Sequence, residues 1–181
     1  MSDLILLAAL LDGPKHGWAL KKLAGFLSAS GDMHNNLVYP LMKKFVAQGW
    51  VRRRSEPGQR GQTRAVYSLT LRGNQELLRR LEQFGEKEAT SASQFRVRVS
   101  LFALLDSQTR HAVLAQRESW LVSRQKHFVA LQDSLTTMKA TGWALEVVAF
   151  LLQEVRHERR WINMLSRKSA GAASFKKLQR R

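Results

Sequence analysis

The sequence predicts a mainly α-helical protein that contains one short antiparallel β-hairpin. Apolar residues recur at helical spacing over most of the chain, whereas residues 50–70 alternate between polar and apolar positions, as strands do. Residues 56–61, which include Pro57, Gly58 and Gly61, separate the two alternating stretches and favour a tight turn. These observations predict helices on both sides of a single hairpin.

Composition narrows the class of partner. The chain has 181 residues, and its 30 Lys and Arg against 14 Asp and Glu give a net charge of +16. Such an excess favours an anionic partner: DNA, RNA or a membrane surface. There is no cysteine, which excludes disulfides and thiolate metal sites. The longest apolar run, Leu4–Leu11, is too short to span a bilayer and lacks signal-peptide flanks. We expect a cytoplasmic, nucleoid-associated protein with no membrane contact, metal or cofactor.

Three helices are expected before the hairpin. The first, Leu4–Leu11, is apolar nearly all round and should be buried. The second covers about residues 18–29. The third begins at Asn35 or Asn36, either of which can cap it, and ends at Gly49. Its predicted buried face consists of Leu37, Leu41, Phe45 and Val46.

The hairpin strands are expected at residues 50–54 and 63–70. In the second strand, period-two alternation places Ala65, Tyr67 and Leu69 on one face. The opposite face then carries Arg64, Val66 and Ser68. Thr70 is expected to cap a fourth helix, which covers about residues 71–87.

The second half of the chain is predicted to be helical, with helices at about residues 95–105, 108–139 and 144–167. The two long helices carry apolar residues at every seventh position, which indicates an antiparallel hairpin. Two helices cannot bury all of this apolar surface, so a second copy of the chain is expected to complete it. The predicted dimer-interface residues are Leu114, Leu121, Phe128, Val148, Val155 and Ile162.

Two charged residues occupy positions in this repeat where apolar residues are expected. Folding the hairpin about residue 141 places Arg124 opposite Glu158, which predicts a salt bridge within the chain or across the dimer. Solvation of both side chains is the alternative.

The expected elements divide the chain into a winged-helix domain at 1–90, a helical dimerisation domain at 91–168 and a basic, disordered tail at 169–181.

A polar-headed helix beside a basic hairpin is typical of a winged helix-turn-helix that binds double-stranded DNA. Asn, Lys and Arg read base edges in the major groove, and basic side chains on a wing contact phosphate. Each residue also has a structural alternative, such as helix capping for Asn36 or packing for Tyr39. The predicted DNA-binding residues are Lys15, His16, His34, Asn35, Asn36, Tyr39, Lys43, Arg60, Gln62 and Arg64.

Four ordered motifs within residues 4–75 resemble the PadR family of bacterial transcriptional regulators. They are an opening at residues 6–20, Leu37–Leu41, Gly49-Trp50-Val51, and the set Arg64, Tyr67, Leu69-Thr70 and Gly73. The chain departs from the family at Trp18, where Tyr is usual, and at residues 33–36. The resemblance implies a homodimer that binds a palindromic operator, most often a repressor released by a small aromatic or lipophilic ligand, with long carboxy-terminal helices forming the dimer.

An effector site and other functions remain open from the sequence. Trp120, Trp143 and Trp161, with Arg124, Arg156 and His157 nearby, suit an aromatic acid, although ordinary core roles are the preferred interpretation. Catalysis is not expected, because the five His are scattered and no phosphate loop or nucleophile elbow is visible. The alternative function is a non-specific nucleoid-architectural or RNA-binding protein.

Overall fold

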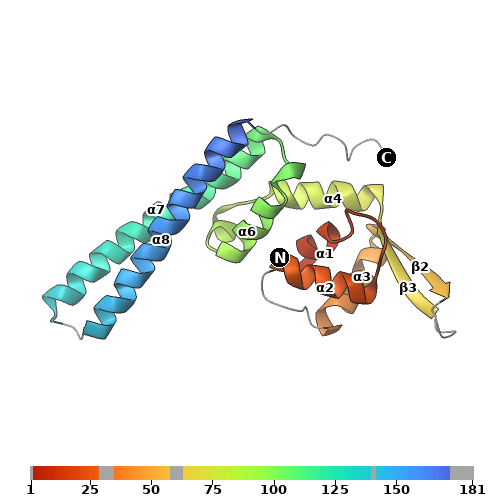
Figure 1. Cartoon of the computed structure of the whole chain (residues 1–181), viewed down its shortest axis with the longest axis horizontal. Helices are drawn as coiled ribbons and strands as arrows, with labels where there is room; N and C mark the ends of the chain where they lie inside the picture. The colour runs from red at the N-terminus through yellow and green to blue at the C-terminus, as the bar shows by residue number, and fades with distance from the viewer. Residues whose placement is uncertain (1, 29–34, 58–62, 140–141, 172–181) are drawn as a thin grey trace. The chain divides into compact units, whose positions relative to one another are not determined.

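The computed structural model describes residues 2–28, 35–57, 63–139 and 142–171 (Figure 1). The chain divides into two compact units. The first contains the residues up to Gln83 together with Arg96–Leu105, and the second contains Phe84–Phe95 and the helical residues from Asp106 onward. Between residues 83 and 106 the chain therefore passes from one unit to the other after Gln83, after Phe95 and after Leu105.

The first unit combines helices with a small antiparallel sheet. Its elements up to Gln83 are α1 (Ser2–Ala8), β1 (Lys15–His16), α2 (Gly17–Ser28), α3 (Asn35–Ala47), β2 (Val51–Pro57), β3 (Thr63–Leu69) and α4 (Leu71–Glu82). The strand order is β1-β3-β2, which places β3 at the centre of the sheet. The short β1 was not expected from the sequence, because two residues carry no readable alternation. This arrangement is a winged helix, and with the helical second unit it confirms the predicted fold class.

Helix α1 lies at the centre of the first core because nearly every one of its side chains is apolar. Residues from Leu4 to Leu10 are all buried, as the sequence predicts. They pack in one apolar cluster with Leu20 of α2, Phe45 of α3 and Leu77 of α4. All four helices therefore depend on one shared core.

The buried face of α3 differs from the predicted one by about one residue. Val38, Met42 and Phe45 are buried, whereas Leu41 is half-buried and Leu37 is 41% exposed. Apolar residues occur in adjacent pairs along this helix, so two neighbouring faces satisfy the helical period equally well. Packing against the other helices selects one of them.

A dense hydrogen-bonded junction joins α3, β2, β3 and α4. The Thr70 hydroxyl lies 2.7 Å from the Gly49 carbonyl oxygen and 2.9 Å from that of Trp50, and it also accepts from the Gly73 N–H at 3.0 Å. Thr70 thus caps α4, as predicted, and also ties α4 to the end of α3. A Cβ atom on Gly73 would lie 2.0 Å from the Trp50 carbonyl oxygen, so only glycine fits there.

A side chain at position 73 should therefore disrupt the first unit. We expect Gly73→Ala to lower the free energy of unfolding by roughly 3 kcal/mol, because the backbone of Trp50 must shift to admit the methyl group. Gly142→Ala is the matched control, since a Cβ there meets nothing within 4 Å. Urea titrations followed by circular dichroism compare the two; equal stability of both variants would contradict this view of the junction.

Ionic contacts hold α1 against α3 and α4. Asp3 lies 3.0 Å from Arg80 and 3.7 Å from Lys44, and Arg80 also contacts Glu76 at 2.6 Å. Hydrogen bonds from Arg79 and Arg80 lower the pKa of Glu76 to about 2, so its carboxylate stays ionised at neutral pH. The guanidinium of Arg80 also lies over the Trp50 ring, at 4.8 Å from its centroid.

Long helices dominate the second unit. Helix α5 (Glu86–Ala89) precedes α6 (Ala92–Ser100), and a 3-10 turn, η1 (Phe102–Leu104), follows in the residues assigned to the first unit. The predicted helix at 71–87 is thus interrupted after Glu82. Helices α7 (Ser107–Thr137) and α8 (Gly142–Gly171) form the predicted antiparallel hairpin (Figure 1). Asp106 caps α7 by accepting from the Thr109 N–H, which lowers the pKa of its carboxyl group.

Helix α8 extends into the segment that the sequence predicts as a disordered tail. Residues 169–171 continue α8, and Ser169 is buried, with its carbonyl oxygen 3.5 Å from the Ser107 hydroxyl. The remainder of that predicted tail, residues 172–181, lies outside the described residues.

The heptad residues hold the hairpin of a single chain together. All six residues predicted for the dimer interface are buried without any second copy: Leu114, Leu121, Phe128, Val148, Val155 and Ile162. A contact between copies would therefore use other side chains of the hairpin.

The predicted salt bridge of Glu158 is formed with Arg117 instead of Arg124. Both carboxylate oxygens of Glu158 accept from Arg117 at 2.8 Å. Arg117 is 2% exposed, also donates to the Ala89 carbonyl, and lies over the Trp120 ring at 4.5 Å. Arg124, one heptad later, lies over the Phe128 ring at 4.4 Å. The two arginines share a heptad position, and only the tertiary partners of Arg117 distinguish them.

Separate substitutions of Arg117 and Arg124 should distinguish the buried ion pair of the first from the ring contact of the second. We expect Arg117→Met to destabilise the chain by about 3 kcal/mol, because it leaves the Glu158 carboxylate largely buried without its cation. Arg124→Met, the control at the same heptad position, should cost less than about 1 kcal/mol. Denaturant unfolding of both variants tests this, and a larger loss for Arg124→Met would contradict the assignment.

Candidate nucleic-acid interface

One side of α3 presents polar side chains to solvent. Asn36 and Lys43 are exposed, and Tyr39 is 50% exposed. The structure thus places these three predicted site residues along one helix. Asn35 begins α3, while His34, Arg60 and Gln62 lie outside the described residues.

The Tyr39 ring is held against the start of α2. A Cβ atom on Gly17 would lie 3.1 Å from a Tyr39 ring carbon and 3.2 Å from its hydroxyl oxygen. The absence of a side chain at Gly17 therefore allows the ring to lie over the backbone there. Tyr39 therefore packs against Gly17, as one of its two expected roles requires, while half of the residue remains exposed.

The strand register separates the two faces of the sheet. His16, Val66 and Arg54 form one cross-strand row, whereas Lys15, Tyr67 and Arg53 form the adjacent row. Tyr67 belongs to the buried core, so its row lies on the core face. The predicted site residues Lys15 and His16 therefore project to opposite faces, and Arg64 lies on the His16 face with Glu56 opposite it.

An exposed aromatic side chain adjoins this region. Trp18 is 71% exposed, and the ammonium group of Lys22 lies 5.5 Å from its ring centroid. Trp18 follows Gly17 directly and replaces the tyrosine that is usual in the resembled family. Trp18 and Lys22 therefore present an indole and an ammonium group to solvent near the start of α2.

Comparison with known families decides the assignment of this unit. Residues 6–79 match the transcriptional regulator PadR-like family. This match covers less than half of the chain, from α1 into α4. The motif residues of this stretch include Gly17 and Gly73, whose missing side chains admit Tyr39 and the Trp50 carbonyl. The motif residue Thr70 caps α4. Several PadR-like motif positions thus have a direct steric or hydrogen-bonding reason in this chain.

Solved structures offer more distant likenesses. Bacillus subtilis PadR in complex with operator DNA is 15% identical, with a TM-score of 0.45, and the match covers 92% of this chain and 98% of that one. The same protein with p-coumaric acid is 15% identical with a TM-score of 0.41, covering 93% and 98%. A candidate transcriptional regulator from Thermoplasma acidophilum is 28% identical with a TM-score of 0.39, covering 43% and 74%. No curated protein matches the sequence.

The tryptophans considered for an effector site do not share one environment. Trp120 stacks with Arg117, and Trp161 meets Phe95 edge-on with ring centroids 5.7 Å apart. Trp143, by contrast, is 83% exposed. Trp120 and Trp161 therefore have packing roles, in agreement with the ordinary core roles that are preferred from the sequence.

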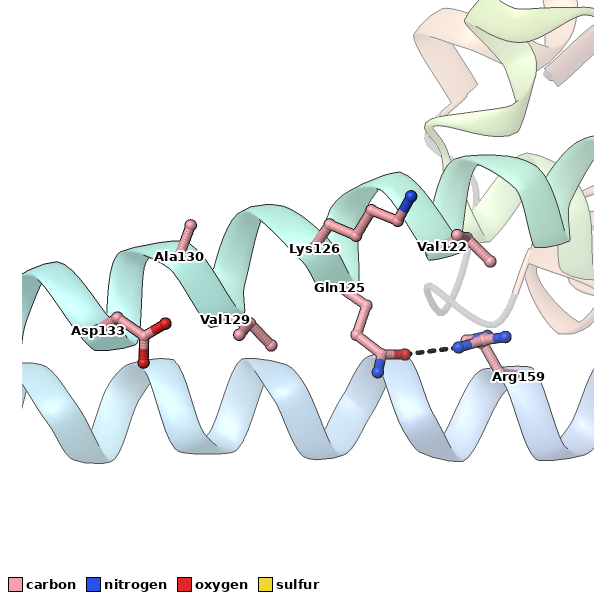
Figure 2. A pocket seen from close by; sticks show the side chains of 7 residues that line it. All are labelled: Val122, Gln125, Lys126, Val129, Ala130, Asp133 and Arg159. Atoms are coloured by element: carbon pink, nitrogen blue, oxygen red, sulfur yellow. Dashed lines mark hydrogen bonds between the residues drawn. The ribbon is translucent and has the colours of Figure 1, made fainter.

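An open pocket of about 370 Å³ lies instead along α7 (Figure 2). Figure 2 shows Val122, Gln125 and Val129 pointing toward α8. Arg159 reaches across from α8, donating to Gln125 and to Glu118, each at 2.7 Å. The residues that line the pocket are Val122, Gln125, Lys126, Val129, Ala130, Asp133 and Arg159.

In the described parts of the chain, no group of three or more His, Asp and Glu side chains is arranged to hold a metal ion. None of the helices described here is long and apolar enough to cross a membrane.

Proposed function

We propose that this PadR-like chain is a sequence-specific, DNA-binding transcriptional regulator that acts as a homodimer. The observation that carries the proposal is the exposed side of α3, where Asn36, Tyr39 and Lys43 lie beside a basic sheet. The net charge of +16 adds a general attraction to DNA. The first unit would read a palindromic operator, and the second would join two copies.

The exposed side chains of α3 would divide between base recognition and phosphate contact. Asn36 can form paired hydrogen bonds with an adenine edge in the major groove, because its amide offers both a donor and an acceptor. Tyr39 and Lys43 can donate to phosphate oxygens, which sets the position of α3 without choosing a sequence. Arg60, Gln62 and Arg64 would act from the wing, and His34 and Asn35 from the start of α3.

Loss of the Asn36 amide should therefore affect specificity. We expect Asn36→Ala to weaken binding to a duplex selected by the protein about tenfold, and binding to random duplex less than about twofold. Gln75→Ala, which removes an exposed amide from α4, is the control and should change neither. Fluorescence anisotropy titrations measure both duplexes; equal losses on both would assign Asn36 no role in base reading.

Dimerisation would use the apolar side chains that the hairpin leaves exposed. Trp143, Val147 and Phe150 are exposed large residues of α8, and their spacing of four and three places them on one helix face. Val129 of α7 and Met138, the residue that caps the end of α7, are also exposed. Exposed apolar side chains of this size favour burial against a second copy.

A charge on this face should separate the copies. We expect Phe150→Glu to weaken the dimer at least tenfold, because association would bury a carboxylate without a partner. Asn163→Asp adds the same charge at an exposed polar position of α8 that is turned about 140° around the helix from Phe150, and it should leave the dimer intact. Sedimentation equilibrium tests both variants. A dimer unchanged by Phe150→Glu would exclude this face.

We further propose that the regulator is a repressor released by a small aromatic or lipophilic ligand. The pocket along α7 supports this, because its volume of about 370 Å³ falls in the range that small molecules occupy. Val122 and Val129 offer apolar contact, and Arg159 offers a guanidinium group at one end. Transcription from a selected promoter, with and without added protein, tests the sign of regulation.

A further inference from the structure

We propose that three exposed arginines of α8 bind the phosphate backbone of the duplex DNA that flanks the operator. These residues, Arg156, Arg160 and Arg167, are called here the α8 arginine stripe. They belong to the second compact unit, whereas α3 and the strands of the wing belong to the first. The proposal rests on the proposed function and adds a DNA contact that the winged helix itself does not make.

Helical spacing places the three arginines on one side of α8. Arg160 follows Arg156 by four residues and Arg167 follows it by eleven, which turns them only about 40° and 20° around the helix from Arg156. At 1.5 Å of rise per residue, the stripe is about 16 Å long. All three residues are exposed. They therefore form a row of positive charge along the helix axis.

The charges of the stripe are not neutralised by the part of the chain that the structure describes. Neighbouring Arg159 lies 2.7 Å from Glu118 of α7, which shows that an arginine of α8 can pair with that helix. Among the described residues, by contrast, no carboxylate lies at ion-pair distance from a guanidinium group of the stripe. The stripe therefore keeps its full charge for an external anion.

The acidic residues of α8 lie away from the stripe. Glu154 and Glu158 precede and follow Arg156 by two residues, so each is turned about 160° around the helix from it. Glu158 is also held by Arg117. Glu146 lies ten residues before Arg156, which corresponds to about 15 Å along the axis. No acidic residue of α8 therefore weakens the attraction of the stripe for an anion at close range.

The stripe would remain accessible in the proposed dimer. Phe150 of the proposed dimer face is turned by about 80° to 120° from the three arginines, and Trp143 and Val147 are turned further from them. The opposite side of α8, with buried Val148 and Ile162, packs against α7. Association through Phe150 and its neighbours would therefore leave the arginines in solvent, so each copy in a dimer would carry one stripe.

Side-chain chemistry favours a phosphate backbone over an acidic protein or a lipid surface. Arginine presents a planar fork of donors that matches two phosphate oxygens. Protein interfaces depend on large apolar or aromatic anchors, and the stripe contains none. A helix that binds a membrane surface inserts its apolar face, whereas the buried apolar face of α8 is occupied by α7.

The length of the stripe also suits duplex DNA. Each DNA strand carries one phosphate for about every 3.4 Å of helix axis, so a row of about 16 Å lies beside several phosphates. Contacts of this kind add affinity without choosing a sequence. The stripe would therefore bind flanking DNA of any sequence, while α3 would select the operator.

The test uses the full chain and two duplexes. One duplex ends at the edges of an operator that the chain selects, and the other extends this operator by about two helical turns of unrelated sequence on each side. The stripe variant combines Arg156→Gln, Arg160→Gln and Arg167→Gln. The control variant combines Lys87→Gln, Lys126→Gln and Lys139→Gln, which remove the same charge from exposed positions of the second unit outside α8.

The stripe variant should lose affinity only for the extended duplex. We expect its binding to that duplex to weaken at least tenfold at about 150 mM salt and the salt slope to fall by about 2.7, or about 0.9 for each lost phosphate contact. Its binding to the short duplex should change less than about twofold, because no flanking phosphates are present. The control variant should retain the preference of the unmodified chain for the extended duplex.

The outcomes separate this proposal from the proposed function. Unchanged binding by the stripe variant, or equal losses for the stripe and control variants, would refute the stripe. Equal losses by the stripe variant on both duplexes would refute contact with flanking DNA. Failure of the unmodified chain to prefer a selected operator over a scrambled one would instead refute the proposed function, and scrambled duplexes of both lengths would still test the stripe. Thermal unfolding and sedimentation equilibrium establish that each variant is folded and assembled as the unmodified chain is.

Discussion

The contact of the first turn of α4 with the Trp50 carbonyl is the constraint on which the first unit depends. Thr70 bonds to the backbone of Gly49 and Trp50, and Gly73 leaves room for that approach. The end of α3, the start of β2 and the end of β3 meet at this point. The helix that would read DNA and the sheet of the wing are therefore attached to one junction, which the Thr70 hydroxyl holds through hydrogen bonds to the Gly49 and Trp50 carbonyls.

Much of this unit could be predicted from the sequence because its signals are local. The alternation of residues 63–70 correctly groups Tyr67 with Ala65 and Leu69, which pack in or against the core, and Thr70 is correctly identified as a helix cap. The strand β1 could not be predicted, since two residues have no period. The buried face of α3 was misassigned because adjacent apolar pairs fit two helix phases, and only the packing of Val38 distinguishes them.

In the second unit, the heptad pattern predicted the hairpin but not the partner of each charge. Arg117 and Arg124 are equivalent in the repeat, yet Arg117 alone finds the Ala89 carbonyl and the Trp120 ring. Ala89 belongs to a short helix far away in sequence, so no local pattern indicates that contact. The sequence also assigns the heptad residues to a dimer interface, because a heptad repeat does not indicate whether its partner helix belongs to the same chain. In the structure these residues pack between α7 and α8 of one chain, and the exposed apolar side chains around Trp143 and Phe150 lie outside that packing.

The central claim is that this chain recognises a DNA sequence, and selection from a pool of genomic fragments at about 150 mM salt tests it most directly, because salt at that level suppresses purely electrostatic binding. Recognition by a homodimer predicts enrichment of an inverted repeat whose half-sites lie about one helical turn apart. Recovery of fragments with no shared sequence, together with steep loss of binding as salt rises, would contradict it and indicate a non-specific basic protein.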